Sequence, residues 1–123
     1  MAKSLKNFIT IKNILGEYNA RQIRFLFLLH NYESLMNYST DKSMPEAVEK
    51  ERQFSEFFKN VKAILRQVNI NETEQKWTPK EYELYNLLSV KTTAVYQSLA
   101  DNFDTPSAVN HLAELVTATN AYL

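Results

Sequence analysis

The sequence predicts an all-α protein, a helical bundle of four to five helices. Apolar residues make up 45% of its 123 residues, with one glycine and three prolines, which argues against β-hairpins and glycine-rich phosphate loops. Apolar side chains also recur at spacings of three and four over several long stretches, as they do on the buried face of a helix. A chain of this length suffices for one domain, burying roughly two-thirds of its unfolded surface.

The first thirty residues predict two helices. Thr10 is placed to cap a short helix over residues 9–16, which Gly16 would end in a left-handed turn. A second helix over residues 19–30 begins with Asn19, followed three residues later by a glutamine in a capping-box pattern. This second segment is apolar nearly all round, so we expect it to be buried on several sides.

A polar and aromatic connection runs from His30 to Ser39. A histidine here suggests acid–base chemistry, but the sequence places no carboxylate or serine to complete a catalytic set. A structural hydrogen bond is therefore the role we expect for His30.

Residues 43–68 predict one long helix, with Ser43 as its cap and Pro45 in its first turn. Glu51 interrupts its apolar stripe, and the spacing favours the core of a bundle over a coiled-coil pair. The stripe comprises Met44, Val48, Phe54, Phe58, Val61, Leu65 and Val68, widened by Phe57 and Ile64.

A polar loop over residues 69–76 precedes the next helix. Thr78 is its expected cap, Pro79 its first residue, and Glu81 closes a capping box. The helix should run to about Asp101. The residues that we expect it to bury are Leu84, Tyr85, Leu88, Val95, Tyr96 and Leu99.

The last helix repeats this pattern, with Thr105 as a cap and Pro106 at the first position. Asp101 and Asp104 suggest a metal pair, but carboxylates at a helix start also stabilise the helix dipole, and the structural interpretation is favoured. The residues that we expect to point inward are Ala108, Val109, Leu112, Leu115, Val116 and Tyr122.

The absence of cysteine excludes disulfides, thiolate metal sites and a cysteine nucleophile. No apolar run approaches the roughly 20 residues that span a bilayer, and no segment resembles a cleavable signal, so a cytoplasmic location is expected. The net charge is zero. Residues 1–42 nevertheless carry six Lys/Arg and three acidic residues, whereas residues 68–104 carry three Lys/Arg and six acidic residues. Any phosphate contact should therefore come from the N-terminal third.

Two motifs resemble those of a known enzyme family. The stretch Lys3–Ile11 (Lys-Ser-Leu-Lys-Asn-Phe-Ile-Thr-Ile) is similar to the end of the Lys-Met-Ser-Lys-Ser signature of class I aminoacyl-tRNA synthetases, continuing as in cysteinyl-tRNA synthetases. The stretch Asp101–Ala108 resembles the Asp-Asp-Phe-Asn-Thr-Pro-x-Ala turn of that family. The two matches lie about a hundred residues apart, in the family's order.

A third match lies between them. The family commonly has His-Tyr-Arg followed shortly by Asn-Tyr-Ser, and Asn37-Tyr38-Ser39 reproduces the second part. Asn31 and Glu33 depart from the first part. Because the arginine is missing, this connection lacks the side chain on which a phosphate-binding role would rest.

The resemblance implies a tRNA-binding helical part of an enzyme that activates cysteine with ATP and esterifies it to tRNA(Cys). Residues 1–40 would be the end of the signature loop and the stem-contact region, and residues 41–123 a helical bundle truncated at its C-terminus. Lys3 matches the second signature lysine and Ser4 matches the closing serine. The resemblance implies that both residues contact the phosphates of ATP. The nucleotide fold, the catalytic residues and the zinc site of the parent enzyme would lie upstream, so the segment alone should be inactive and hold neither ATP nor metal.

The expected partners are tRNA(Cys) and the catalytic domain of the same enzyme. The tRNA-contact candidates are Lys6, Lys12, Arg21 and Arg24. For Arg21 and Arg24, one turn apart, the alternative is that they are solvated or pair with Glu17. We expect the segment to be a monomer or to self-associate weakly through residues 5–15, which should pack on helix 19–30 or on another copy.

The rival interpretation is a free-standing helical protein–protein interaction module that binds a partner helix, through a surface such as the 43–68 stripe. Composition and periodicity permit both interpretations. Salt sensitivity distinguishes them, because RNA binding weakens with each phosphate contacted as salt rises.

Overall fold

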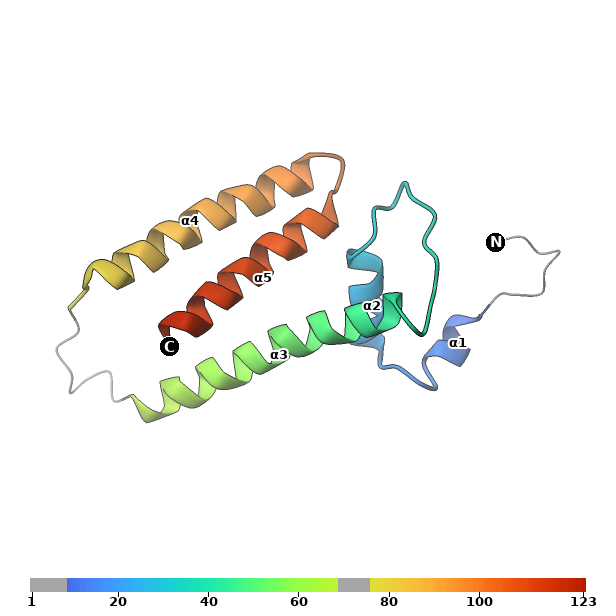
Figure 1. Ribbon diagram of the computed structural model, residues 1–123, viewed down its shortest axis with the longest axis horizontal. Coiled ribbons are helices and arrows are strands. Elements are labelled where there is room, and N and C mark those ends of the chain that lie inside the picture. Colours follow the sequence, from blue (N-terminus) through green and yellow to red (C-terminus); the bar gives the residue numbers. More distant parts are fainter. Residues whose placement is uncertain (1–8, 69–75) are drawn as a thin grey trace.

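The computed structural model describes residues 9–68 and 76–123, which form five α-helices and no strand. The prediction of an all-α bundle is confirmed. Helix α4 lies antiparallel to α5 as a hairpin, α2 packs on α3, and both α2 and α3 contact α5 (Figure 1). The helices are α1 (Ile11–Ile14), α2 (Ala20–Leu28), α3 (Ser43–Gln67), α4 (Pro79–Ala100) and α5 (Thr105–Tyr122).

The predicted caps of the first two helices are confirmed. The Thr10 hydroxyl accepts the Asn13 amide at 3.2 Å, and Asn19 and Gln22 form a reciprocal capping box at the start of α2. The predicted end of α1 is wrong, because Gly16 does not take a left-handed conformation. The helix instead ends at Ile14 and buries none of its residues.

The chain enters α3 through Ser39 rather than through a cap by Ser43, which corrects the prediction. The Ser39 hydroxyl accepts the amides of Asp41 and Lys42, each at 3.2 Å. The Ser43 hydroxyl accepts the Ser39 amide at 2.8 Å and donates to the Ser39 carbonyl at 3.1 Å. Tyr38 packs against the buried Leu26–Met44 cluster, and burial raises the pKa of its hydroxyl. The Asn-Tyr-Ser motif therefore has a structural role here.

The start of α4 is as predicted, with Thr78 and Glu81 in a capping box and Pro79 in the first turn. The start of α5 differs. Its cap is Asp104, whose carboxylate accepts the Ser107 amide at 3.2 Å, and not Thr105. Hydrogen bonding from Ser107, first from its side chain and then from this amide, holds the pKa of Asp104 below its usual value.

Two small clusters form the core. Phe54 of α3 packs with Val109, Ala113 and Val116 of α5. Leu26 of α2 packs with Met44 and Ala47 of α3. Phe25 and Leu29 of α2 contact both clusters, and the Phe25 and Phe54 rings lie 5.7 Å apart. One apolar layer thus ties α2 and α3 to α5.

The predicted burial of α4 is mostly wrong. No residue of α4 is buried, although Leu84 and Val95 are partly covered. The cause is that α4 packs on α5 along one side only, so much of its apolar surface has no neighbour. The same openness exposes side chains predicted as core in the other helices. The exposed ones are Phe27 and Leu28 of α2, Phe58 and Leu65 of α3 with Val68 directly after it, Tyr85, Leu88, Tyr96 and Leu99 of α4, and Leu112 and Tyr122 of α5.

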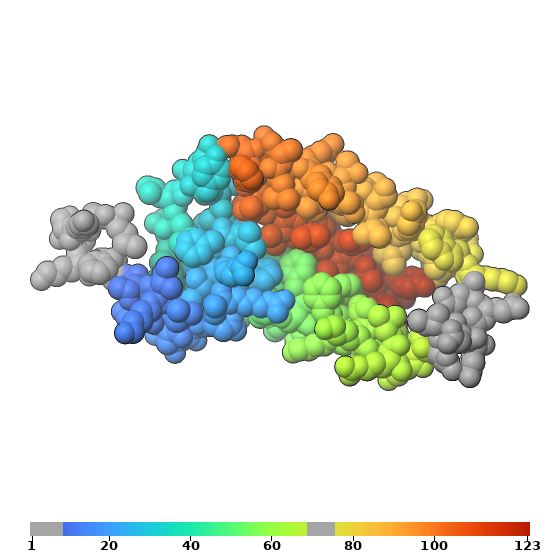
Figure 2. Space-filling view, turned by 180° about the vertical axis from the view of Figure 1, so that it is seen from behind, coloured from blue at the N-terminus to red at the C-terminus, as the bar shows by residue number. Residues whose placement is uncertain are grey.

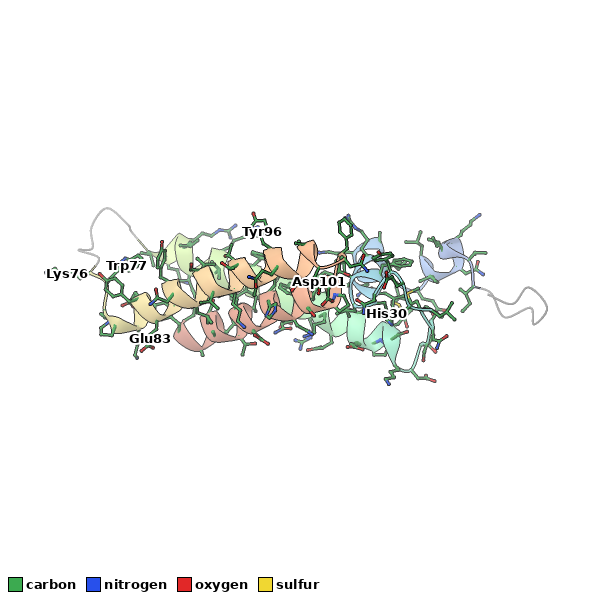
Figure 3. All side chains as sticks on the ribbon, turned by 90° about the horizontal axis from the view of Figure 1, so that it is seen from above. His30, Lys76, Trp77, Glu83, Tyr96 and Asp101 are labelled. Carbon is green, nitrogen blue, oxygen red and sulfur yellow. The ribbon has the colours of Figure 1, made fainter. Side chains whose placement is uncertain are left out.

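An apolar groove of about 750 Å³ lies where these surfaces face one another. Its lining residues come from α3, α4 and α5, with Arg21, Phe25 and Leu28 of α2; α5 (red) is visible between α3 (green) and α4 (orange and yellow) in Figure 2. Trp77 stands at the start of α4, with its ring 5.2 Å from Tyr82 and 5.4 Å from Tyr85 (Figure 3). Among the described helices, none is long and apolar enough to cross a membrane.

Candidate nucleic-acid interface

Two predicted tRNA-contact residues are solvent-exposed cations. Lys12 lies on α1, whose side chains all remain unburied, and Arg24 projects from α2. Within residues 9–68 and 76–123, neither forms an ion pair. Both are therefore available to phosphate oxygens. The other N-terminal candidates, Lys3, Ser4 and Lys6, lie outside the described residues.

Arg21 occupies a different environment from Arg24. Its Nε lies 3.5 Å from Glu51 Oε1, and the Arg21 side chain is 62% exposed while that of Glu51 is 15% exposed. Ser55 also donates to the same carboxylate oxygen at 2.6 Å. The alternative expectation that Arg21 pairs with Glu17 is therefore wrong. Glu51, which interrupts the apolar stripe of α3, does so because it pairs with α2.

A second set of exposed cations follows the last acidic residue of α3. Lys59, Lys62 and Arg66 are exposed and form no ion pair within the described residues. At 3.6 residues per turn their spacing places them within about 60° of one another around the helix. We call these three residues the α3 basic stripe. Sequence reasoning missed it, although residues 57–68 contain three basic residues and no acid.

Arg52, about two turns before the stripe, already has acidic partners. Its guanidinium donates to Glu49 at 2.6 and 2.9 Å and to Glu56 at 2.7 Å, and these bonds raise its pKa. The same arginine lowers the pKa of the Glu49 carboxyl. Arg52 therefore presents little free charge to a phosphate, and it serves as an internal control for the stripe.

His30 forms the structural hydrogen bond predicted for it. Its Nδ1 lies 2.8 Å from the Leu26 carbonyl oxygen, one turn back in α2 (Figure 3). A ring N–H donating to this carbonyl satisfies the end of the helix.

The described residues do not fit a zinc site. No group of three or more histidine or acidic side chains in this part of the chain is arranged to hold a metal, and the chain has no cysteine. Asp104, half of the aspartate pair considered from the sequence, is the cap of α5.

Comparison with known proteins identifies the family. The tRNA synthetases class I (C) catalytic-domain family matches residues 1–50. Cytoplasmic cysteine–tRNA ligase of Dictyostelium discoideum is 46% identical over 123 residues, and that of Homo sapiens is 42% identical over 124 residues. Both alignments cover all of this chain. The chain belongs to the cysteinyl-tRNA synthetase family.

This synthetase segment is a small part of its relatives. It spans 18% of the Dictyostelium ligase, 16% of the human ligase and 15% of the ligase of Mus musculus, which is 43% identical. The resemblance carried by the signature-like start and the Thr-Pro turn is thereby confirmed. Within this synthetase segment, the catalytic-domain match includes α1, α2 and the beginning of α3.

Proposed function

We propose that this chain is the tRNA-binding helical part of a cytoplasmic cysteine–tRNA ligase. The observation that supports this most strongly is the similarity of the whole chain to one segment of such ligases. The exposed cations on α1, α2 and α3 supply the chemistry, because unpaired lysine and arginine bind phosphates and release counterions. The polynucleotide is tRNA(Cys), and the other partner is the catalytic domain of the same ligase.

In this proposal residues 1–40 brace the catalytic loop and contact the tRNA stem, and residues 41–123 extend along the tRNA. Lys3 and Ser4 contact the phosphates of ATP in the full ligase. A lysine in that position stabilises charge that develops on the phosphates during cysteine activation. Lys3→Ala in the full ligase should slow cysteine-dependent ATP–pyrophosphate exchange and leave tRNA affinity unchanged. Weakened tRNA binding with normal exchange would reassign Lys3.

Apart from the proposed ATP contacts of Lys3 and Ser4, we expect the catalytic residues and zinc ligands of the parent enzyme to lie outside this segment. Purified chain should therefore show no cysteine-dependent ATP–pyrophosphate exchange above background. Measurable exchange would contradict the assignment as a binding segment.

Titration with tRNA(Cys) at two salt concentrations tests the binding function directly. The logarithm of the association constant should fall with the logarithm of the salt concentration, with a slope of about −0.9 per duplex phosphate contacted. An unrelated tRNA measures the sequence-independent part. Absence of binding at low salt would overturn the proposal.

The second candidate function is a protein–protein interaction module, and the apolar groove is the observation that favours it. A partner helix in this groove would bury apolar side chains of α3, α4 and α5. Such binding would change little with salt. The same titration therefore separates the two candidates.

A further inference from the structure

A long-range hydrogen-bonded cluster joins the connection between α2 and α3 to the turn between α4 and α5. The Tyr32 hydroxyl donates to Asn102 Oδ1 at 2.6 Å, and Asn102 Nδ2 donates to Glu33 Oε1 at 2.7 Å. Figure 3 shows Asp101, the neighbour of Asn102, on the side of the molecule where His30 starts this connection. The oxygen of the Asn102 side-chain amide thus accepts from Tyr32 and its nitrogen donates to Glu33, so one amide contacts two consecutive residues.

The held segment has little else to fix it. No residue from 31 to 35 is buried; the Tyr32 side chain is 66% exposed and Leu35 is 91% exposed. Its backbone makes a local bond from the Ser34 amide to the Asn31 carbonyl at 3.0 Å. Apolar burial therefore contributes almost nothing to the order of this segment, and the contacts to Asn102 have to supply it.

The backbone explains why an asparagine stands at the turn. Asn102 and Phe103 have φ values of 53° and 56°, in the left-handed region. Asparagine tolerates this conformation better than most residues. Its side chain is then free to reach the α2–α3 connection, so position 102 combines a backbone requirement with a side-chain contact.

The neutral amide of Asn102 also suits the negative charge of Glu33. An aspartate at 102 would set a second carboxylate against Glu33, whereas the asparagine amide donates to it. An asparagine at 102 therefore avoids repulsion between two carboxylates.

We propose that Tyr32, Glu33 and Asn102 form a clasp that orders the α2–α3 connection, and that Asn102 is a positioning residue for tRNA binding. The clasp also ties the Glu33 carboxylate to the α4–α5 hairpin. The part that concerns tRNA rests on the proposed function.

The experiment compares four variants of the full chain. Asn102→Gly keeps the left-handed backbone and removes both contacts. Asn102→Asp opposes Glu33, Glu33→Arg removes the acceptor, and Glu33→Arg/Asn102→Asp restores the contact as an ion pair. Asn110→Asp, at an exposed position of α5, is the matched control for the charge change. Hydrogen exchange at the Ser34 amide and tRNA(Cys) affinity are measured for each.

Two exposed hydrogen bonds, each at the lower end of the net strength that such bonds have, predict about fivefold faster exchange at Ser34 and about fivefold weaker tRNA binding in Asn102→Gly. The double variant should return both quantities toward the wild type, and Asn110→Asp should change neither. Unchanged exchange or unchanged affinity in Asn102→Gly, or no rescue in the double variant, would overturn the clasp. Failure of the wild-type chain to bind tRNA would instead overturn the proposed function, because the exchange measurement needs no RNA.

Discussion

At the scale of single residues, Glu81 shows how one side chain can serve two structures. Its carboxylate accepts the Thr78 amide at 2.6 Å, which closes the capping box of α4. Its other oxygen accepts the Tyr122 hydroxyl at 2.6 Å, from the last turn of α5. The hydrogen bonds from Thr78 and then from Tyr122 lower the pKa of Glu81 from 4.5 to about 2, and the carboxylate in turn raises the pKa of Tyr122.

This pKa predicts an acid dependence of stability. Because the folded-state pKa is depressed, the contribution of Glu81 is complete above pH 4.5 and is lost as the pH falls toward about 2. Glu81→Gln should therefore lose less thermal stability than the wild type over this interval. Melting temperatures measured across the range test this. Glu83→Gln, on the exposed surface of the same helix, is the control and should follow the wild type.

Local residue patterns allowed most helix starts to be predicted from the sequence, because a cap and its partner lie within three residues of each other. Asn19 and Thr78 are examples. The cap of α5 was assigned to Thr105 instead of Asp104, because both residues have side chains that can cap a helix and they are adjacent. Only the left-handed turn decides between them. Ser43 was misassigned because its partner, Ser39, lies in the preceding connection.

At the scale of elements, α3 combines a core-forming part with an exposed part. Phe54 is 9% exposed and joins α3 to α5, whereas Phe58, one turn later, is 52% exposed at the groove. The sequence assigns both to one apolar stripe. Their difference could not be predicted, because it depends on where α5 and α4 lie in space.

Truncating these two phenylalanines should separate their roles. Phe54→Ala should lower the free energy of unfolding by about 3 kcal/mol, because it removes a buried ring and leaves a space. Phe58→Ala should cost about 1 kcal/mol or less, since its ring is largely in solvent. Denaturant unfolding gives both values. Equal losses would mean that the groove is closed in solution.

The α3 basic stripe carries the second prediction at this scale. The triple variant Lys59→Gln/Lys62→Gln/Arg66→Gln should weaken tRNA(Cys) binding and reduce the salt slope by up to about three, roughly one for each lost phosphate contact. Arg52→Gln, which removes a cation already bound to Glu49 and Glu56, is the matched control. An equal effect of both variants would show that only net charge matters.

At the scale of the whole molecule, the N-terminal apolar residues remain uncovered. Ile9, Ile11 and Leu15 are 43%, 60% and 49% exposed, and α1 has no buried residue. The prediction that residues 5–15 pack on helix 19–30 is therefore wrong for the described residues 9–15. Association between copies stays a prediction.

Light scattering over a hundredfold dilution tests that association. If α1 mediates it, the mean mass should fall toward that of one chain on dilution. Ile11→Gln/Leu15→Gln should remain monomeric throughout, because it removes apolar area from the contact. Leu35→Gln, which alters a still more exposed apolar side chain elsewhere, should behave as the wild type. A monomer at all concentrations would exclude self-association.

The position of Phe54 in the middle of α3 has a mechanical consequence. Before this residue, α3 is held by α2 and α5; from Lys59 to Val68 every side chain is exposed or only partly covered. The final turns of α3 are thus anchored at one end only, and Lys62 and Arg66 lie on the end without packing partners. Such an end should open its helical hydrogen bonds sooner than the anchored part. Phosphates that bind there would have to order these turns. The entropy cost of that ordering would offset part of their attraction for the two cations.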